Sequence, residues 1–185
     1  MKIFGKTSLA LLLIALSIGV AVPVMADTEA PPADYTIETE NGKYIFVMLA
    51  PERPGWVSKK AEIRKLYKDS GLYNKDGTYE PLWQVFWYSF TVYPASDGKH
   101  VVRMGPWAQS VSNLAIAFYA EGKELKRYTI SDLVKDTNKL KHTVSHFFWR
   151  TDLKYDDKAG TVFLKTVDGI SYTFSVKTGE VIEKK

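Results

Sequence analysis

Glycine-containing turn pairs divide this sequence into short runs of β-type residues. Three are Asp-Gly pairs, at residues 76–77, 97–98 and 168–169, and Asn41-Gly42 is an equivalent pair. Such pairs are typical of type I′ turns between antiparallel strands. The runs of aromatic and β-branched residues around them cover residues 43–49, 82–93, 100–104, 114–119, 125–130, 144–149, 161–167, 170–176 and 181–182. The sequence therefore predicts a mainly β protein built of antiparallel sheets.

One or two short helices are expected among the strands. Ser58 can cap a helix in which Ile63, Leu66 and Tyr67 share one face, and Gly71 can end it in the left-handed conformation. A shorter helix is expected between Ser131 and Thr137.

The longest apolar run, residues 82–93, predicts a single strand. Alternation places large apolar side chains on both of its faces, as in a strand that is covered on both sides.

A turn followed by a β-type run recurs along the chain. Asn41-Gly42-Lys43, Asp97-Gly98-Lys99 and residues 157–160 each precede such a run, at intervals of 56 and about 60 residues. The segments NGKYIFV, DGKHVVRM and YTFSVKTGEVI resemble blade segments of β-propeller repeat proteins. That resemblance implies stacked β-blades, although a closed propeller typically needs four to eight of them. The length gives room for about three blades, so we expect either an open blade-like stack or a β-sandwich.

The first 26 residues have the layout of a secretory signal peptide. Lys2 and Lys6 form a positive start, residues 9–22 are apolar and uncharged, and a small-residue motif ends at Ala26. The apolar run is shorter than the roughly 20 residues that span a bilayer. We therefore predict cleavage between Ala26 and Asp27, and a location in the periplasm or outside the cell.

Removal of residues 1–26 leaves 159 of the 185 residues, enough for one domain. We expect residues 27–34 to form a flexible lead and residues 35–185 to form a single β-rich domain. The formal net charge of +4 falls to about +2 without the two leader lysines, which does not favour nucleic acid as a partner. No cysteine is present, so the fold contains no disulfide. The segments RMGPWA and SHFFWR also resemble parts of small exported bacterial proteins of unassigned activity.

The sequence contains no catalytic motif of useful specificity and none that implies a cofactor. His142 and His146 are four residues apart, as two metal ligands on a helix could be, but their segment reads as extended. On a strand they would lie about 13 Å apart, too far to share an ion. Surface or interface histidines are therefore favoured, and Asp152, Asp156 and Asp157 are the nearby ligands if a metal binds.

The leading functional hypothesis is a non-catalytic exported binding domain for a glycan or a peptide. Trp56 and Trp107 are the candidate platforms, because proline and glycine place both in loops. Arg103 joins them as a candidate ligand contact, since a guanidinium near an indole can stack or bind a carboxylate. The alternative, which the residues favour, is that Arg103 and Trp107 belong to a bend packed under the core. Two alternatives are a hydrolase acting on polysaccharide through paired carboxylates such as Glu38 and Glu40, and a structural accessory subunit of an exported complex.

Overall fold

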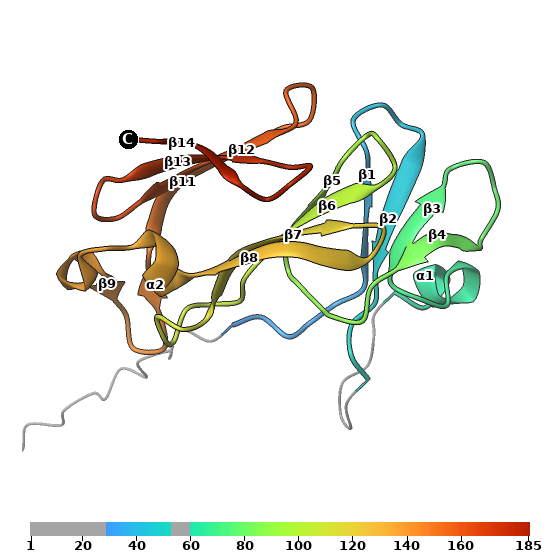
Figure 1. The fold of residues 1–185 in the computed structure, drawn as a ribbon. Helices are drawn as coiled ribbons and strands as arrows, with labels where there is room; N and C mark the ends of the chain where they lie inside the picture. The colour runs from blue at the N-terminus through green and yellow to red at the C-terminus, as the bar shows by residue number, and fades with distance from the viewer. Residues whose placement is uncertain (1–28, 53–59) are drawn as a thin grey trace, which may run out of the picture.

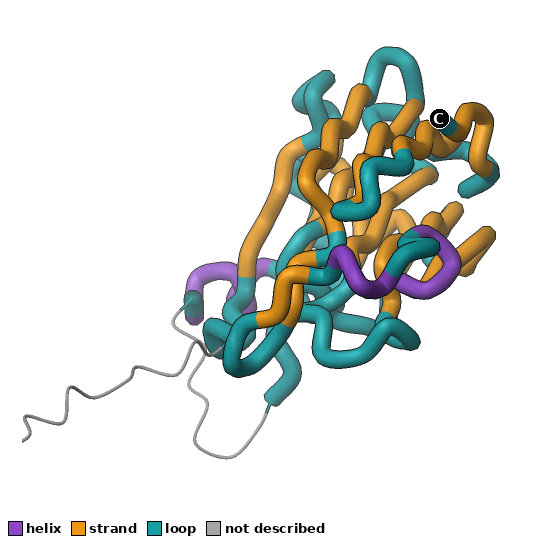
Figure 2. The backbone as a smooth tube through the Cα atoms, turned by 90° about the vertical axis from the view of Figure 1, so that its left-hand side faces the viewer, coloured by secondary structure: helices purple, strands orange, loops and turns teal. Residues whose placement is uncertain are grey.

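The strands form three four-stranded antiparallel sheets, each made of consecutive strands (Figure 1). The computed structural model describes residues 29–52 and 60–185, so the predicted signal peptide with its Ala26–Asp27 cleavage site, as well as Trp56 and Ser58, lies outside the described residues. The backbone is mainly β, with short helical segments at only a few places (Figure 2). The expected fold class is confirmed.

Each sheet is named here by its order in the chain. The first sheet contains β1 (Tyr35–Glu38), β2 (Tyr44–Met48), β3 (Gly71–Asn74) and β4 (Pro81–Gln84). The middle sheet contains β5 (Val92–Pro94), β6 (His100–Met104), β7 (Leu114–Ala120) and β8 (Lys123–Thr129). The last sheet contains β11 (Arg150–Asp156), β12 (Thr161–Thr166), β13 (Ser171–Ser175) and β14 (Val181–Lys184).

The remaining elements are short. They are α1 (Ala61–Leu66), α2 (Ile130–Leu133), a 3₁₀ turn at Thr137–Lys139, and a small hairpin of β9 (Lys141–His142) and β10 (Phe147–Phe148). Within the described residues, no helix has the length and apolar character needed to cross a membrane.

The middle sheet is buried on both faces by its two neighbours. On β6, Val101 packs in a cluster with residues of the first sheet, whereas Val102 packs in a cluster with residues of the last sheet. Successive residues of a strand point to opposite faces, so this alternation places one sheet on each side. The three sheets therefore form a stack with two apolar layers (Figure 1).

The recurring turns occupy equivalent positions in the three sheets. Each joins the first strand of a sheet to the second, between β1 and β2, β5 and β6, and β11 and β12. The turns also touch one another. The backbone N–H of Asn41 donates to Ser96 Oγ over 3.1 Å, and the backbone N–H of Ser96 donates to Asp157 Oδ1 over 2.9 Å. The first strands of the sheets consequently approach each other, and the rings of Tyr93 on β5 and Tyr155 on β11 stack with centroids 5.2 Å apart.

The expected turn type was wrong at the Asn-Gly and Asp-Gly pairs. Gly42 and Gly98 have positive φ, but the only described non-glycine residue with positive φ is Glu121. The N–H of Gly42 bonds to Thr39 O, while Asn41 Oδ1 accepts the N–H of Lys43. The Asx side chain thus holds its own residue in an ordinary conformation, and only the glycine that follows is left-handed.

The expected single strand over residues 82–93 is two strands. β4 ends at Gln84 and β5 begins at Val92, because the chain passes here from the first sheet to the middle sheet. Within the crossing, Ser89 Oγ accepts the N–H of Thr91 and lies 2.8 Å from Met104 O, so local side-chain bonds replace a strand ladder. The segment is not covered on both sides as expected, because Val85 and Val92 are buried in the cluster shared with the first sheet whereas Phe86 is 92% exposed.

Gly71 does not end a helix. The helix α1 ends at Leu66, and Gly71 instead begins β3 beside β4. A Cβ at this position would lie 2.1 Å from Trp83 O, so the glycine permits close strand approach. The second helix begins one residue before Ser131 and is capped by the Thr129 side chain.

Candidate functional site

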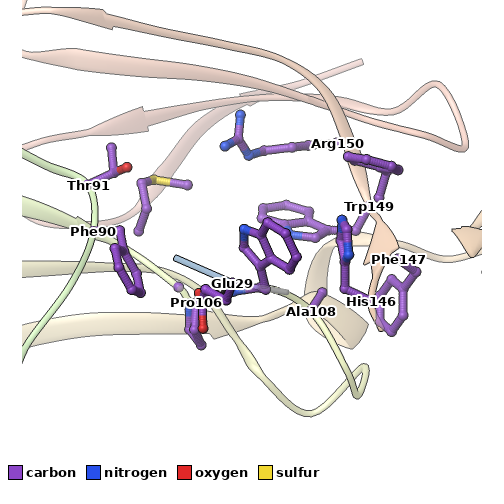
Figure 3. Close-up of a pocket in the computed structure, with 13 residues that line it drawn as sticks. Glu29, Phe90, Thr91, Pro106, Ala108, His146, Phe147, Trp149 and Arg150 are labelled. Carbon is purple, nitrogen blue, oxygen red and sulfur yellow. Dashed lines mark hydrogen bonds between the residues drawn. The ribbon is translucent and has the colours of Figure 1, made fainter. Parts of the chain in front are cut away.

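A cavity of about 390 Å³ lies between the middle and last sheets, where loops lead into their first strands (Figure 3). One wall is residues 104–108, from the last residue of β6 onward, and another is residues 146–150, which include β10 and the start of β11. Glu29, Phe90 and Thr91 complete the lining. Segments that are distant in the sequence therefore meet at one place.

The backbone of the loop after β6 is held firmly against its neighbours. The N–H of Gly105 donates to Ala115 O over 3.1 Å, and a Cβ on Gly105 would lie 1.6 Å from Leu114 O. The N–H of Phe147 donates to Ala108 O over 2.9 Å, in an isolated bridge between the two walls. These contacts fix Trp107 opposite the hairpin that carries His146.

Aromatic rings form most of the cavity wall. Trp107 stacks on His146 with centroids 4.1 Å apart and planes inclined by 33°. The edge of Phe148 meets the same imidazole at 4.9 Å, and His146 Nδ1 lies 2.9 Å from Thr143 Oγ1. Trp149 is buried, whereas Phe148 remains 52% exposed. The cavity thus combines a packed aromatic wall with accessible ring surface, an arrangement suited to the apolar faces of a ligand.

Two charged side chains lie among these rings. The guanidinium of Arg150 lies over the indole of Trp149, with Cζ 5.9 Å from the ring centroid. Figure 3 shows the Arg150 side chain extending across the cavity towards Thr91. Glu29 Oε1 accepts the backbone N–H of Trp107 over 3.1 Å. The site can therefore offer a cation and an anion to a ligand as well as flat apolar surface.

The structure places the candidate Trp107 in the cavity wall, but not the candidate Arg103. Arg103 lies instead between the first and middle sheets, where its guanidinium stacks 4.6 Å from the Trp87 ring and donates to Tyr88 O. The Nε of Arg103 and the Nε1 of Trp87 are buried and have no hydrogen-bond partner among the described residues. Burial raises the pKa of the neighbouring Tyr119, and the charge of Arg103 acts in the opposite direction. Trp56 lies outside the described residues.

The two histidines occupy a tight hairpin. His142 on β9 pairs with Phe147 on β10, and their rings lie 5.3 Å apart, whereas His146 faces the cavity. Within residues 29–52 and 60–185, no group of three or more His, Asp or Glu side chains could hold a metal ion. The nearby acidic candidates have other contacts. Asp156 accepts the N–H of Ala159, Asp157 accepts that of Ser96, and Asp152 lies 3.5 Å from Lys154.

Sequence reasoning missed Phe90, Phe148, Arg150 and Glu29 as wall residues. The segment SHFFWR, in which aromatic residues adjoin an arginine, contains Phe148 and Arg150 and could have indicated both. Phe90 and Glu29 are brought to the site only by the crossing between sheets and by the segment before β1.

No protein-family model matches the chain, and no curated protein matches it either.

Proposed function

We propose that this chain is an exported, non-catalytic binding domain that holds a glycan or a peptide in the aromatic cavity. One observation carries the proposal: rings from two separate segments converge on a small cavity that also contains a guanidinium and a carboxylate. Binding sites for small ligands are typically concave and lined by aromatic groups, with a few polar groups that fix orientation.

The number of carboxylates among the described cavity residues supports binding rather than hydrolysis. Glycosidases generally place two carboxyl groups on either side of the bond that they cleave. Among the described wall residues, Glu29 is the one carboxylate, and it is bonded to a backbone N–H. Glu38, one of the acids considered for hydrolysis, forms an ion pair with Lys75 over 2.6 Å.

Export is part of the same proposal. It rests on the charged start, apolar run and small-residue motif of residues 1–26. Mass spectrometry of the protein from the exporting cell should give an N-terminus at Asp27. A mature chain that still begins at Met1 would contradict it.

A thermal-shift screen tests whether the domain binds such a ligand. We expect one or more soluble glycans, cell-wall fragments or short peptides to raise the melting temperature of the purified protein. A ligand at a hundredfold excess over Kd adds about 2.7 kcal/mol to the stability of the native state. For a domain of this size that corresponds to several degrees. If no glycan or peptide raises the melting temperature, the proposal is wrong.

A further inference from the structure

Arg150 differs from the other described arginines in its surroundings. Arg64 pairs with Asp34, Arg127 pairs with Glu124, and Arg103 donates to Tyr88 O. The side chain of Arg150 has no ion pair or hydrogen bond to any described residue, and its charge lies over the Trp149 ring at the cavity. A planar guanidinium with free donors binds a carboxylate through two parallel hydrogen bonds.

The cavity also accommodates a carboxylate elsewhere on its wall. Glu29, which precedes β1 and is exposed, places its carboxylate on the backbone N–H of Trp107. That N–H is therefore satisfied within the protein, whereas the Arg150 guanidinium lies over the Trp149 ring at the cavity. A ligand that combines a ring with an acidic group would contact both the aromatic rings and the Arg150 guanidinium.

The backbone of the walls favours a ligand recognised by side chains. The N–H groups of Met104, Gly105 and Phe147 are bonded within the protein, to Thr91 O, Ala115 O and Ala108 O. An extended peptide that adds to a sheet needs free backbone groups along an edge. A saccharide needs none, because its apolar face stacks on aromatic rings and its substituents bond to side chains.

We propose, building on the proposed function, that the ligand is a saccharide bearing a carboxylate and that Arg150 binds this carboxylate while Trp107 packs against the sugar ring. Glu29 lies in the same cavity and its charge repels a bound acid. It therefore lowers the affinity for an acidic saccharide more than the affinity for a neutral one.

The test compares each acidic saccharide with a neutral counterpart of the same shape by isothermal titration calorimetry. The acids are tri-galacturonate, a hyaluronan tetrasaccharide and N-acetylmuramic acid, and each is paired with its own methyl ester. At low salt we expect the wild-type protein to bind at least one acid about tenfold more tightly than its neutral counterpart, as for a hydrogen bond to a charged group.

Three variants assign the preference to the cavity. Arg150→Gln should weaken binding of the acid about tenfold and so abolish its preference over the neutral counterpart. Glu29→Gln should raise affinity for the acid a few-fold, because it removes a like charge. Lys154→Gln is the matched control, since Lys154 is an exposed cation on the same strand outside the cavity walls, and it should keep the preference.

The outcomes separate this inference from the proposed function. Equal affinity for acid and neutral saccharide, unchanged in Arg150→Gln, overturns the carboxylate assignment and leaves the binding function intact. Binding of tri-alanine, with no saccharide bound, overturns the saccharide assignment alone. Failure of every saccharide and peptide to bind overturns both.

Discussion

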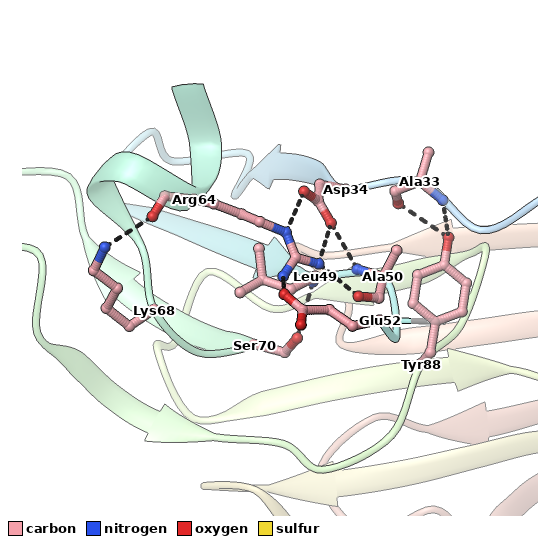
Figure 4. Close-up of polar contacts among 9 residues, drawn as sticks. All are labelled: Ala33, Asp34, Leu49, Ala50, Glu52, Arg64, Lys68, Ser70 and Tyr88. Carbon is pink, nitrogen blue, oxygen red and sulfur yellow. Dashed lines mark hydrogen bonds and ion pairs between the residues drawn. The ribbon is translucent and has the colours of Figure 1, made fainter. Parts of the chain in front are cut away.

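Asp34 is only 1% exposed, and its carboxylate joins the segment before β1 to the helix α1 (Figure 4). It accepts hydrogen bonds from Arg64 Nε at 2.8 Å and Nη2 at 3.0 Å, and from the N–H of Ala50 at 2.7 Å. None of the residues of α1 is buried, so this ion pair, rather than an apolar face, attaches the helix. The pKa of Arg64 is raised, chiefly by its hydrogen bond to Asp34.

We expect Asp34→Asn to lower the free energy of unfolding by about 3 kcal/mol, because it removes one partner of a buried ion pair. Glu52→Gln is the control, since Glu52 contacts the same arginine but its side chain is 88% exposed, and it should cost about 0.5 kcal/mol or less. Urea denaturation measures both. Equal effects of the two substitutions would show that burial does not matter at this ion pair.

The location of a single residue was predictable where the adjacent sequence determines it. The loop position of Trp107 follows from Gly105-Pro106, and the structure places it at a cavity wall. The surroundings of Arg103 do not follow, because the indole that faces it, Trp87, belongs to the crossing between sheets. Asp34 likewise meets an arginine 30 residues further along the chain, which no local pattern indicates.

The turn between β12 and β13 also contacts the chain after α2, through the side chain of one residue, Asp168. Asp168 accepts the N–H groups of Lys135 at 2.7 Å and Asp136 at 3.0 Å, and it also accepts the hydroxyl of Thr166. It therefore anchors the chain after α2 to the last sheet. Burial acts to raise the pKa of Asp168, but these hydrogen bonds outweigh it and the pKa is lowered.

The lowered pKa gives a pH-dependent prediction. A carboxyl group whose pKa is lower in the folded state stabilises the fold above its unfolded pKa of about 4, and this contribution is lost as pH falls through the folded value. Asp168→Asn should therefore reduce the free energy of unfolding by about 1 kcal/mol at about pH 6. The difference from wild type should shrink at about pH 3. Urea titrations at both pH values measure it, and a difference independent of pH would contradict the role of the ionised carboxylate.

Elements with clear alternation and a turn on each side were predicted best. The expected strand at residues 100–104 is β6 without any shift, and the expected strand at residues 114–119 is β7 with one residue more at its end. β3 was missed because its sequence, GLYN, is short and begins with glycine. The run 144–149 contains only the two residues of β10, since Thr143 and His146 close a tight turn through their backbone and side chains.

The middle sheet shares an apolar cluster with each neighbouring sheet, and this sharing determines how the whole molecule unfolds. Leu72 belongs to the cluster with the first sheet and Leu164 to the cluster with the last sheet, and both are fully buried. Neither outer sheet can lose its packing without exposing a face of the middle sheet. Unfolding should therefore be one cooperative transition.

Substitutions in the two clusters test this cooperativity. Leu72→Ala and Leu164→Ala should each lower the free energy of unfolding by about 3 kcal/mol, through lost burial and a residual cavity. Each should shift the whole transition, whether it is followed by tryptophan fluorescence or by far-UV circular dichroism. Two separate transitions, with each variant moving only one of them, would show that the outer sheets unfold independently.

The sequence predicted the β class and the recurring turn, and the turn proved to occupy the same position in each sheet. The order of stacking was not predictable, because it depends on which face of each strand meets which neighbour. The cavity was missed for the same reason, since its walls come from loops that only the stack brings together.

The central claim is that the aromatic cavity binds the ligand, and calorimetric titration of cavity variants tests it most directly. The ligand is the compound with the largest shift in the thermal screen. Trp107→Ala and Phe148→Ala should each weaken binding by a factor of about 5 to 30, as expected for loss of a stacking contact worth about 1–2 kcal/mol. Phe86→Ala removes a ring that is 92% exposed and lies outside the cavity walls, so it should bind like wild type. Unchanged affinity in both cavity variants, with their cooperative unfolding retained, would contradict the claim and place the binding site elsewhere on the molecule.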